Sequence, residues 1–214
     1  VPLGIQWGCQ VSLDVTRDEA LLDLMARSGC VAALAGFESL DEDNLAQMRK
    51  RFNTVGGPYA EAIARFHARG IMVYGSFVFG YDHDGPDCFA RTAQFALDHK
   101  LFLVNFSALQ PTPATRLYDR LESEGRLLFD RWWTDPTYRY GDAAYRPALM
   151  SPEALTDGCR DARWRFYRAS SVLRRATNRD ANARTPARLA LYLGANAISR
   201  RALKSKLGRP LGAC

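Results

Sequence analysis

The stretch LAGFESLDEDNLAQMRK (residues 34–50) changes from an apolar run to a helical pattern around Glu38. Its apolar part belongs to CVAALAGF (30–37), which is uniformly apolar, as expected for a strand that is covered on both faces. Ser39 is followed three residues later by Glu42, which matches a capping box and predicts a helix that starts at Ser39. The stretch therefore predicts a strand with the acidic side chain of Glu38 at its C-terminal end, followed directly by a helix.

The same alternation recurs through the first 125 residues. Further apolar runs of strand length are LGIQWGCQVSL (3–13), IMVYGSFVFG (71–80) and LFLVNFSAL (101–109). Further segments of helical period are one capped by Thr16, one opened by Pro58 that runs to Arg69, one at 86–99 and one at 115–124. Four βα units in series are typical of a parallel sheet, so the sequence predicts an α/β fold.

Beyond Gly125 this alternation stops. Residues 126–150 are rich in aromatic and turn-forming residues and are expected to wrap irregularly against the sheet. Ser151 and Pro152 open a long helix with an apolar stripe from Leu155 to Leu173. A linker is expected at 177–185, and Pro186 begins a last, basic helix. The chain thus divides into residues 1–125, 126–177 and 178–214.

Composition limits the function classes. The 214 residues, 47% hydrophobic and 24% charged, suffice for one hydrophobic core in a soluble globular protein. We find no signal peptide and no apolar run of bilayer length, so a cytoplasmic location is expected. The five cysteines are scattered without a CxxC spacing, which predicts neither a disulfide framework nor a metal site within the chain.

Charge is distributed unevenly along the chain. Residues 151–214 hold 14 Lys and Arg against 4 Asp and Glu, which leaves 15 against 19 in residues 1–150. The simpler interpretation is a solvated helical face, and the alternative is a surface that grips acidic lipid or nucleic acid. We retain a peripheral anionic membrane as a candidate partner and expect no nucleic acid. The basic residues considered are Arg160, Arg163, Arg165, Arg168, Arg174, Arg175, Arg200, Arg201, Lys204 and Lys206.

Polar side chains stand where each predicted strand ends. Parallel α/β folds bind ligands at the carboxyl ends of their strands, where loops and helix N-termini meet. The residues found there are Gln10, Ser12 and Asp14, then Glu38 and Ser39, then Ser76, Tyr81 and Asp82, and finally Ser107. A polar group within an apolar strand needs a partner, and one bound polar ligand could serve Gln10, Glu38 and Ser76 together. Glu38 alone is explained equally well by the dipole of the following helix.

Several motifs in register resemble a known family. They are W..Q.S.D (7–14), GFESL....L..M.K (36–50), GSFVFGYDHD (75–84), LQPTPATRLY (109–118) and GRLL (125–128), followed by YRPALMSPEAL....R.ARWRFY (145–167). Their order and spacing resemble radical S-adenosylmethionine (SAM) enzymes, especially the subgroup with an N-terminal cobalamin-binding domain. The resemblance covers about residues 3–175. It implies strands three to six of a partial (β/α)6 barrel of TIM type, followed by a mainly helical C-terminal extension.

The resemblance also implies a site for SAM. Gln10 and Glu38 would hydrogen-bond its ribose or methionine end, Lys50 would approach its carboxylate, and Ser76 would lie at the ribose. The main chain around Leu109 would contact adenine. The complete set of expected cofactor-binding residues is Gln10, Ser12, Glu38, Lys50, Ser76 and Leu109.

The sequence also departs from the family. The CxxxCxxC loop that holds the [4Fe-4S] cluster is absent, as are the family's second strand and the cobalamin-binding domain. Ala114 stands where the related motif usually has glycine. We therefore expect a C-terminal fragment, inactive by itself, whose partner is the missing N-terminal part of the same polypeptide. The cluster, and cobalamin if it is used, would belong only to the full-length parent.

Alternatives stay open for the function. The parent would cleave SAM reductively to a 5′-deoxyadenosyl radical, with cobalamin-dependent methyl transfer as one outcome, on a small-molecule or lipid substrate that the sequence does not identify. A second hypothesis is a binding module that works through the basic tail. A third is a different α/β barrel that uses the same strand ends for another ligand.

Overall fold

The structure, a computed structural model, describes residues 4–50 and 58–212. Four parallel strands pair in the order β1-β2-β3-β4, so each strand lies beside its neighbour in the sequence. Their bounds are β1 Trp7–Val11, β2 Cys30–Glu38, β3 Met72–Phe79 and β4 Leu103–Ala108. The prediction of four parallel strands in an α/β fold is therefore confirmed.

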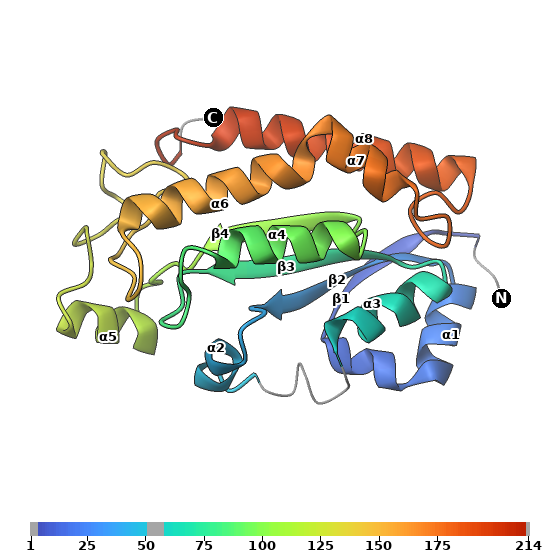
Figure 1. Ribbon diagram of the computed structural model, residues 1–214, viewed down its shortest axis with the longest axis horizontal. Coiled ribbons are helices and arrows are strands. Elements are labelled where there is room, and N and C mark those ends of the chain that lie inside the picture. The colour runs from blue at the N-terminus through green and yellow to red at the C-terminus, as the bar shows by residue number, and fades with distance from the viewer. Residues whose placement is uncertain (1–3, 51–57, 213–214) are drawn as a thin grey trace.

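Helices lie in the predicted regions (Figure 1). A short 3-10 helix, η1 (Leu13–Arg17), precedes α1. The α-helices are α1 Glu19–Arg27, α2 Glu42–Gln47, α3 Tyr59–Ala68, α4 Cys88–Asp98, α5 Arg116–Ser123, α6 Pro152–Tyr167, α7 Ala169–Ala176 and α8 Pro186–Lys206. The long terminal helix is thus confirmed with Pro186 in its first turn.

Two predicted helix caps are wrong. Thr16 lies inside η1, where its hydroxyl donates to the carbonyl of Leu13, and Asp18 caps α1 instead. Ser39 is followed by a turn before the helix, and Asp41 caps α2 by accepting the backbone N–H of Asn44 at 3.0 Å. In both places the helix is capped by an aspartate two residues further along the chain. The residues before each aspartate form the turn that leads out of the preceding strand.

The long helix expected from Ser151 to beyond Leu173 is broken. Ser151 caps α6 as predicted, but α6 ends at Tyr167, and Arg168 is extended (φ −66°, ψ 151°) before α7 begins. The Ser171 hydroxyl donates to the carbonyl of Arg165 at 2.7 Å and so fixes the break. The apolar period of the sequence continues across this position, so periodicity alone could not reveal it.

One face of the sheet carries the core. Alternate residues of β2, β3 and β4 are buried, and three of them, Phe37, Phe77 and Phe106, are at most 1% exposed. They pack in one hydrophobic cluster with residues of α3, α4 and α6, such as Ile63 and Phe166. Figure 1 shows α3 and α4 on this side of the strands.

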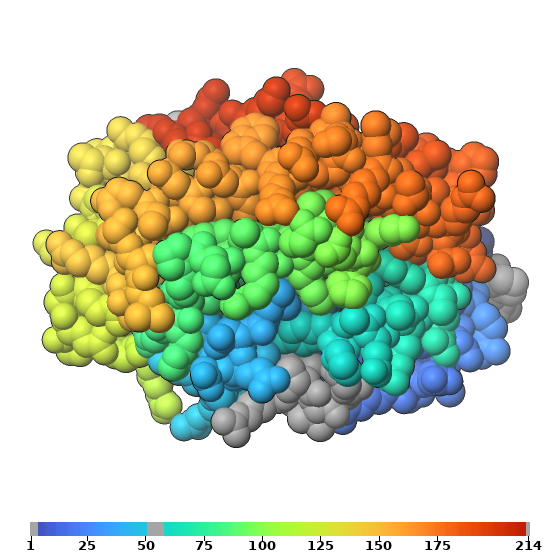
Figure 2. Space-filling view, viewed as in Figure 1, coloured from blue at the N-terminus to red at the C-terminus, as the bar shows by residue number. Residues whose placement is uncertain are grey.

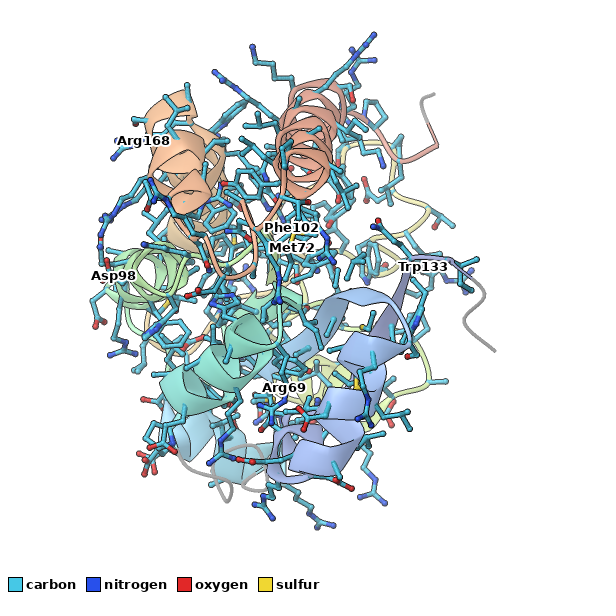
Figure 3. The ribbon with its side chains drawn as sticks, turned by 90° about the vertical axis from the view of Figure 1, so that its right-hand side faces the viewer. Arg69, Met72, Asp98, Phe102, Trp133 and Arg168 are labelled. Atoms are coloured by element: carbon cyan, nitrogen blue, oxygen red, sulfur yellow. The ribbon has the colours of Figure 1, made fainter. Side chains whose placement is uncertain are left out.

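The opposite face of the sheet is only partly covered by described residues. Ala32, Leu34 and Gly36 of β2 are half-buried, so the expectation that both faces of this strand are covered is wrong over the described chain. Cover comes from α8, which packs Tyr192 against Met72 and Phe102 near the amino-terminal ends of β3 and β4 (Figure 3). The part of this face near the carboxyl ends of the strands is therefore the part left open.

Residues 126–150 contain no helix or strand and pack against the carboxyl end of the sheet. The buried Tyr145 hydroxyl donates to the carbonyl of Gly80 at the end of β3. The segment at 177–185 is likewise irregular, but it is packed: Asn182 is fully buried, and its amide donates to the carbonyls of Lys100 and Arg175. Through Asn182 this second segment is consequently anchored to α7 and to the loop before β4.

Candidate functional site at the strand ends

Glu38 ends β2 in an unusual backbone conformation. Its φ is +65°, in the left-handed region, and the pairing of β2 with β3 is irregular between Gly36 and Glu38. Its carboxylate folds back over its own strand, because a Cβ added to Gly36 would lie 2.7 Å from Glu38 Oε1. A bulge with positive φ re-aims a side chain at a strand end, and glycine at position 36 leaves the room that this requires.

Lys50 reaches the same strand end. Helix α2 is followed by Arg49 with φ +56°, which turns the chain so that the N–H of Lys50 bonds the carbonyl of Leu45 at 2.8 Å. The Lys50 ammonium then lies 2.7 Å from Glu38 Oε1, with 38% and 19% of the two side chains exposed. The opening stretch of the sequence thus brings both of its charged site candidates together.

The open face of the sheet carries a group of polar side chains. Gly36, Ser76 and Asn105 lie opposite one another across β2, β3 and β4, while Gln10 pairs with Leu34 one row earlier. Gln10 and Asn105 are exposed and Ser76 is half-buried. None of the three polar side chains has a hydrogen-bond partner within the described chain, so all three are free to meet a ligand.

Asn105 was missed by the sequence prediction. A signal for it exists, because a polar residue interrupts the apolar run LVNFSA at a position that alternates with the buried Val104 and Phe106. Ser12, in contrast, was predicted and lies beyond β1, where its hydroxyl donates to the carboxylate of Asp14. Of these two residues, Asn105 is the one that the structure places beside Ser76.

A buried polar clamp joins the loops that follow β2 and β3. Asp84 accepts the N–H groups of Gly80 and Tyr81 at 2.9 and 3.1 Å, and it accepts the side-chain amide of Asn44 at 2.9 Å. Asn44, fully buried, accepts the N–H of His83 at 3.1 Å. Burial raises the pKa of Asp84, against the hydrogen bonds that it accepts. The clamp fixes α2, and with it Lys50, relative to the end of β3.

A cavity of about 490 Å³ opens beside this clamp. Its lining residues are Gln47, Met48, Tyr81, Asp82, Leu109, Arg116, Leu117 and Arg120, so one expected site residue, Leu109, lies in it. The N–H of Leu109 is taken by the carbonyl of Phe79 at 2.8 Å. Burial, with the carboxylates of Glu38 and Asp84, raises the pKa of Tyr81, whose side chain lines this cavity.

Asp82 lines this cavity and forms hydrogen bonds and ion pairs with the side chains around it. Burial alone would raise the pKa of Asp82, but hydrogen bonds from Arg120 (2.5 Å) and Gln47 (2.7 Å) lower it. Arg126 approaches the same carboxylate at 3.3 Å. Asp82 is therefore a structural anion here and is already fully engaged.

The described residues do not provide a metal or cluster site. No group of three or more His, Cys, Asp or Glu in residues 4–50 and 58–212 could hold a metal ion. Cys30, Cys88 and Cys159 are buried, and burial raises the pKa of the Cys30 and Cys159 thiols to about 12. Protonated thiols that do not gather in a group of three do not suit a [4Fe-4S] cluster, so the cluster does not fit these residues.

In the same described residues, no helix is long and apolar enough to cross a membrane.

Comparison with known proteins gives a consistent set of relatives. Residues 115–203, less than half of the chain, match the domain of unknown function DUF4070. The chain is 28% identical over 180 residues to a bacteriochlorophyllide d C-12(1)-methyltransferase of Chlorobaculum tepidum, covering 84% of this chain and 38% of that protein. It is 30% identical over 126 residues to a hopanoid C-2 methylase of Rhodopseudomonas palustris, covering 59% of this chain and 24% of the other.

Among solved structures, the chain is similar to the radical S-adenosylmethionine methyltransferase TsrM from Kitasatospora setae, solved with cobalamin and a [4Fe-4S] cluster bound. The TM-score is 0.47 at 15% identity, over 94% of this chain and 45% of TsrM. This chain therefore spans less than half the length of each of these three relatives.

Proposed function

We propose, from the premise that this chain is a relative of the cobalamin-associated radical SAM enzymes, that it supplies the SAM-binding half of such an enzyme. In this proposal the four βα units are strands three to six of a partial (β/α)6 barrel. The uncovered face of the sheet is then the interior of the barrel, and the carboxyl ends of its strands are the mouth. This geometry would place Glu38, Lys50 and Ser76 around one ligand.

One observation carries the proposal: unpartnered polar side chains on the open face lie at the same end of the sheet as an ion pair. The methionine end of SAM bears an ammonium and a carboxylate, and Glu38 and Lys50, 2.7 Å apart, offer the complementary charges. The hydroxyl of Ser76 and the amide of Asn105, neighbours across β3 and β4, suit ribose hydroxyls. Gly36, which has no side chain, leaves the room in which the Glu38 carboxylate folds over the strand toward this group.

The remaining predicted residues fit the two ends of the same ligand. Gln10 lies on the same open face, in the strand next to that of Gly36. Leu109 lines the cavity between α2 and α5. The apolar walls of that cavity, Met48 and Leu117, suit the flat face of adenine. Ser12, already bonded to Asp14, would need to exchange that partner to take part.

In this proposal the half of the site that holds the cluster is not part of this chain, so the chain does not cleave SAM alone. When bound beside a reduced cluster, SAM supplies a 5′-deoxyadenosyl group by reductive cleavage, and the residues described above include no cluster ligands. The free edge of β1 pairs with no described strand, which supports further strands placed there by the N-terminal part of the parent. We infer that this chain binds SAM without cleaving it. The names of two relatives, a methyltransferase and a methylase, support methyl transfer as the reaction of the parent.

Calorimetric titration of the chain with S-adenosylhomocysteine, which keeps the methionine, ribose and adenine groups, tests the binding site. Glu38→Gln and Lys50→Met should each weaken binding by about tenfold to a hundredfold, as expected for hydrogen bonds to charged groups. Glu122→Gln, an exposed charge change on α5, is the matched control and should leave the affinity unaltered. Equal affinities for all variants would show that the ligand binds elsewhere.

Inactivity is tested separately. After anaerobic reconstitution with iron and sulfide, the chain should show no stable cluster absorbance and no release of 5′-deoxyadenosine from SAM. A stable cluster with turnover would contradict the half-site proposal even if the binding data agreed with it.

A further inference from the structure

Helices α7 and α8 form an outer layer on the side of the molecule away from α1 and α3 (Figures 1 and 2). The inner side of α8 is buried through Tyr192 and Asn196. Outside this buried side, two of its apolar residues, Leu193 and Ile198, are 41% and 72% exposed. Leu173 of α7 is 65% exposed. We call this surface, α7 together with the outer side of α8, the α7–α8 face.

A groove runs between the two helices of the α7–α8 face. It encloses about 490 Å³, with apolar walls that include Val172, Leu173 and Leu193. Its other end is lined by three cations, Arg200, Arg201 and Lys204, and by no acidic residue. Apolar side chains and cations therefore share one exposed surface.

The positive charge of the C-terminal residues is not balanced by acidic residues in the same part of the sequence. After Asp180 the sequence has no acidic residue, but it has seven basic ones, of which four lie in the second half of α8 or directly at its end. These four are Arg200, Arg201, Lys204 and Lys206. None of their side chains has an ion-pair or hydrogen-bond partner within the described chain.

Other basic residues of the tail are engaged within the fold and do not contribute to this surface. Arg175 is fully buried and donates to the carbonyls of Leu101 and Phe102 at 2.9 Å. Arg163 is 7% exposed and donates to the carbonyl of Phe106 at 2.5 Å. Arg174 forms an ion pair with Asp98 at 2.7 Å, and Arg160 forms one with Asp157 at 2.6 Å. The free cations are thus concentrated on α8.

We propose that the α7–α8 face docks the protein on an anionic lipid bilayer. Exposed aliphatic side chains beside unpaired cations match the boundary between acyl chains and phosphate headgroups, where an interfacial helix lies in the plane of the membrane. A purely acidic surface would satisfy the cations but not Leu173 and Ile198, and a nucleic acid would leave the same apolar groups in water. A bilayer with anionic headgroups satisfies both sets of groups.

Co-sedimentation of the 214-residue chain with vesicles tests this proposal, using phosphatidylcholine alone and phosphatidylcholine mixed with phosphatidylglycerol. Binding should require the anionic lipid and should weaken as salt rises. The triple variant Arg200→Gln, Arg201→Gln, Lys204→Gln should bind the anionic vesicles about a hundredfold more weakly, since each cation near the surface contributes about fivefold. The matched control is Arg17→Gln, Arg27→Gln, Arg131→Gln, which removes the same charge from exposed positions elsewhere and should lose little.

The apolar part of the face is tested by Leu173→Ala with Ile198→Ala. These exposed side chains do not support the fold, so thermal unfolding should be unaltered while residual binding at high salt falls about tenfold or more. Equal binding to neutral and anionic vesicles, equal losses in the two triple variants, or no vesicle binding at low salt would each overturn the proposal. No cofactor is involved, so the result is independent of the proposed SAM site.

Discussion

The ammonium of Lys50 lies 2.7 Å from the carboxylate of Glu38, and the two residues lie on either side of the turn and helix that follow β2. Neither side chain is fully buried, and partly exposed ion pairs contribute little to stability. The left-handed conformation of Glu38, in contrast, costs about 1 kcal/mol or more for a residue with a Cβ. The geometry at this strand end therefore serves the placement of charge more than the stability of the fold.

This relationship predicts different stabilities for two substitutions at position 38. Glu38→Gly and Glu38→Ala both remove the ion pair, but only glycine relieves the positive φ, so Glu38→Gly should be more stable than Glu38→Ala by about 1 kcal/mol. Urea unfolding of both variants measures the difference. Equal midpoints would mean that the backbone at position 38 is not strained.

A second strained position is Ala114, with φ +61° in the turn before α5. Ala114→Gly should raise the free energy of unfolding by about 1 kcal/mol, because glycine adopts this conformation without a steric penalty. The matched control is Ala190→Gly, at an exposed position inside α8, which should lower stability by about 1 kcal/mol. If both glycines destabilise, the turn does not hold Ala114 in the left-handed region.

These two positions show what the sequence can and cannot predict. The family motif indicated that position 114 usually holds glycine, and the structure supplies the reason. The strands and α8 were predictable because their apolar periods are decided locally. The break between α6 and α7 was not, since it depends on Ser171 bonding the carbonyl of Arg165.

The solvent exposure of individual side chains was the other property that the sequence did not predict. Arg175 and Arg200 look alike in the basic tail, yet the first is fully buried against main-chain carbonyls and the second lines an open groove. Asn105 and Val104 are neighbours in one strand, and only the packing of α6 on one face makes the first exposed and the second buried. Which face of a sheet stays open is a property of the whole fold.

The clamp around Asn44 predicts a third, larger effect. Asn44→Ala should lower the free energy of unfolding by about 2 to 3 kcal/mol, because the buried carboxylate of Asp84 and the N–H of His83 each lose a partner. Asn105→Ala removes the same side chain from an exposed position and should change stability by less than about 0.5 kcal/mol. Similar losses at both positions would contradict a special role for the buried clamp.

His67 predicts how stability depends on pH. Its Nδ1 lies 3.1 Å from the amide of Asn178, its Nε2 is buried without a partner within the described chain, and burial lowers its pKa from 6.5 to about 4. The folded state thus binds this proton less readily than the unfolded chain does. The full stability of the folded state is therefore present above about pH 6.5. Up to about 3 kcal/mol of the free energy of unfolding is lost as the pH falls toward 4.

Urea unfolding of His67→Gln between pH 7 and pH 4 should show most of this pH dependence removed. His99, whose pKa burial also lowers, supplies part of the remainder. The control His83→Gln changes an exposed ring and should keep the pH dependence of the parent chain. If His67→Gln loses as much stability on acidification as the parent chain does, protonation of His67 does not account for the loss of stability at low pH.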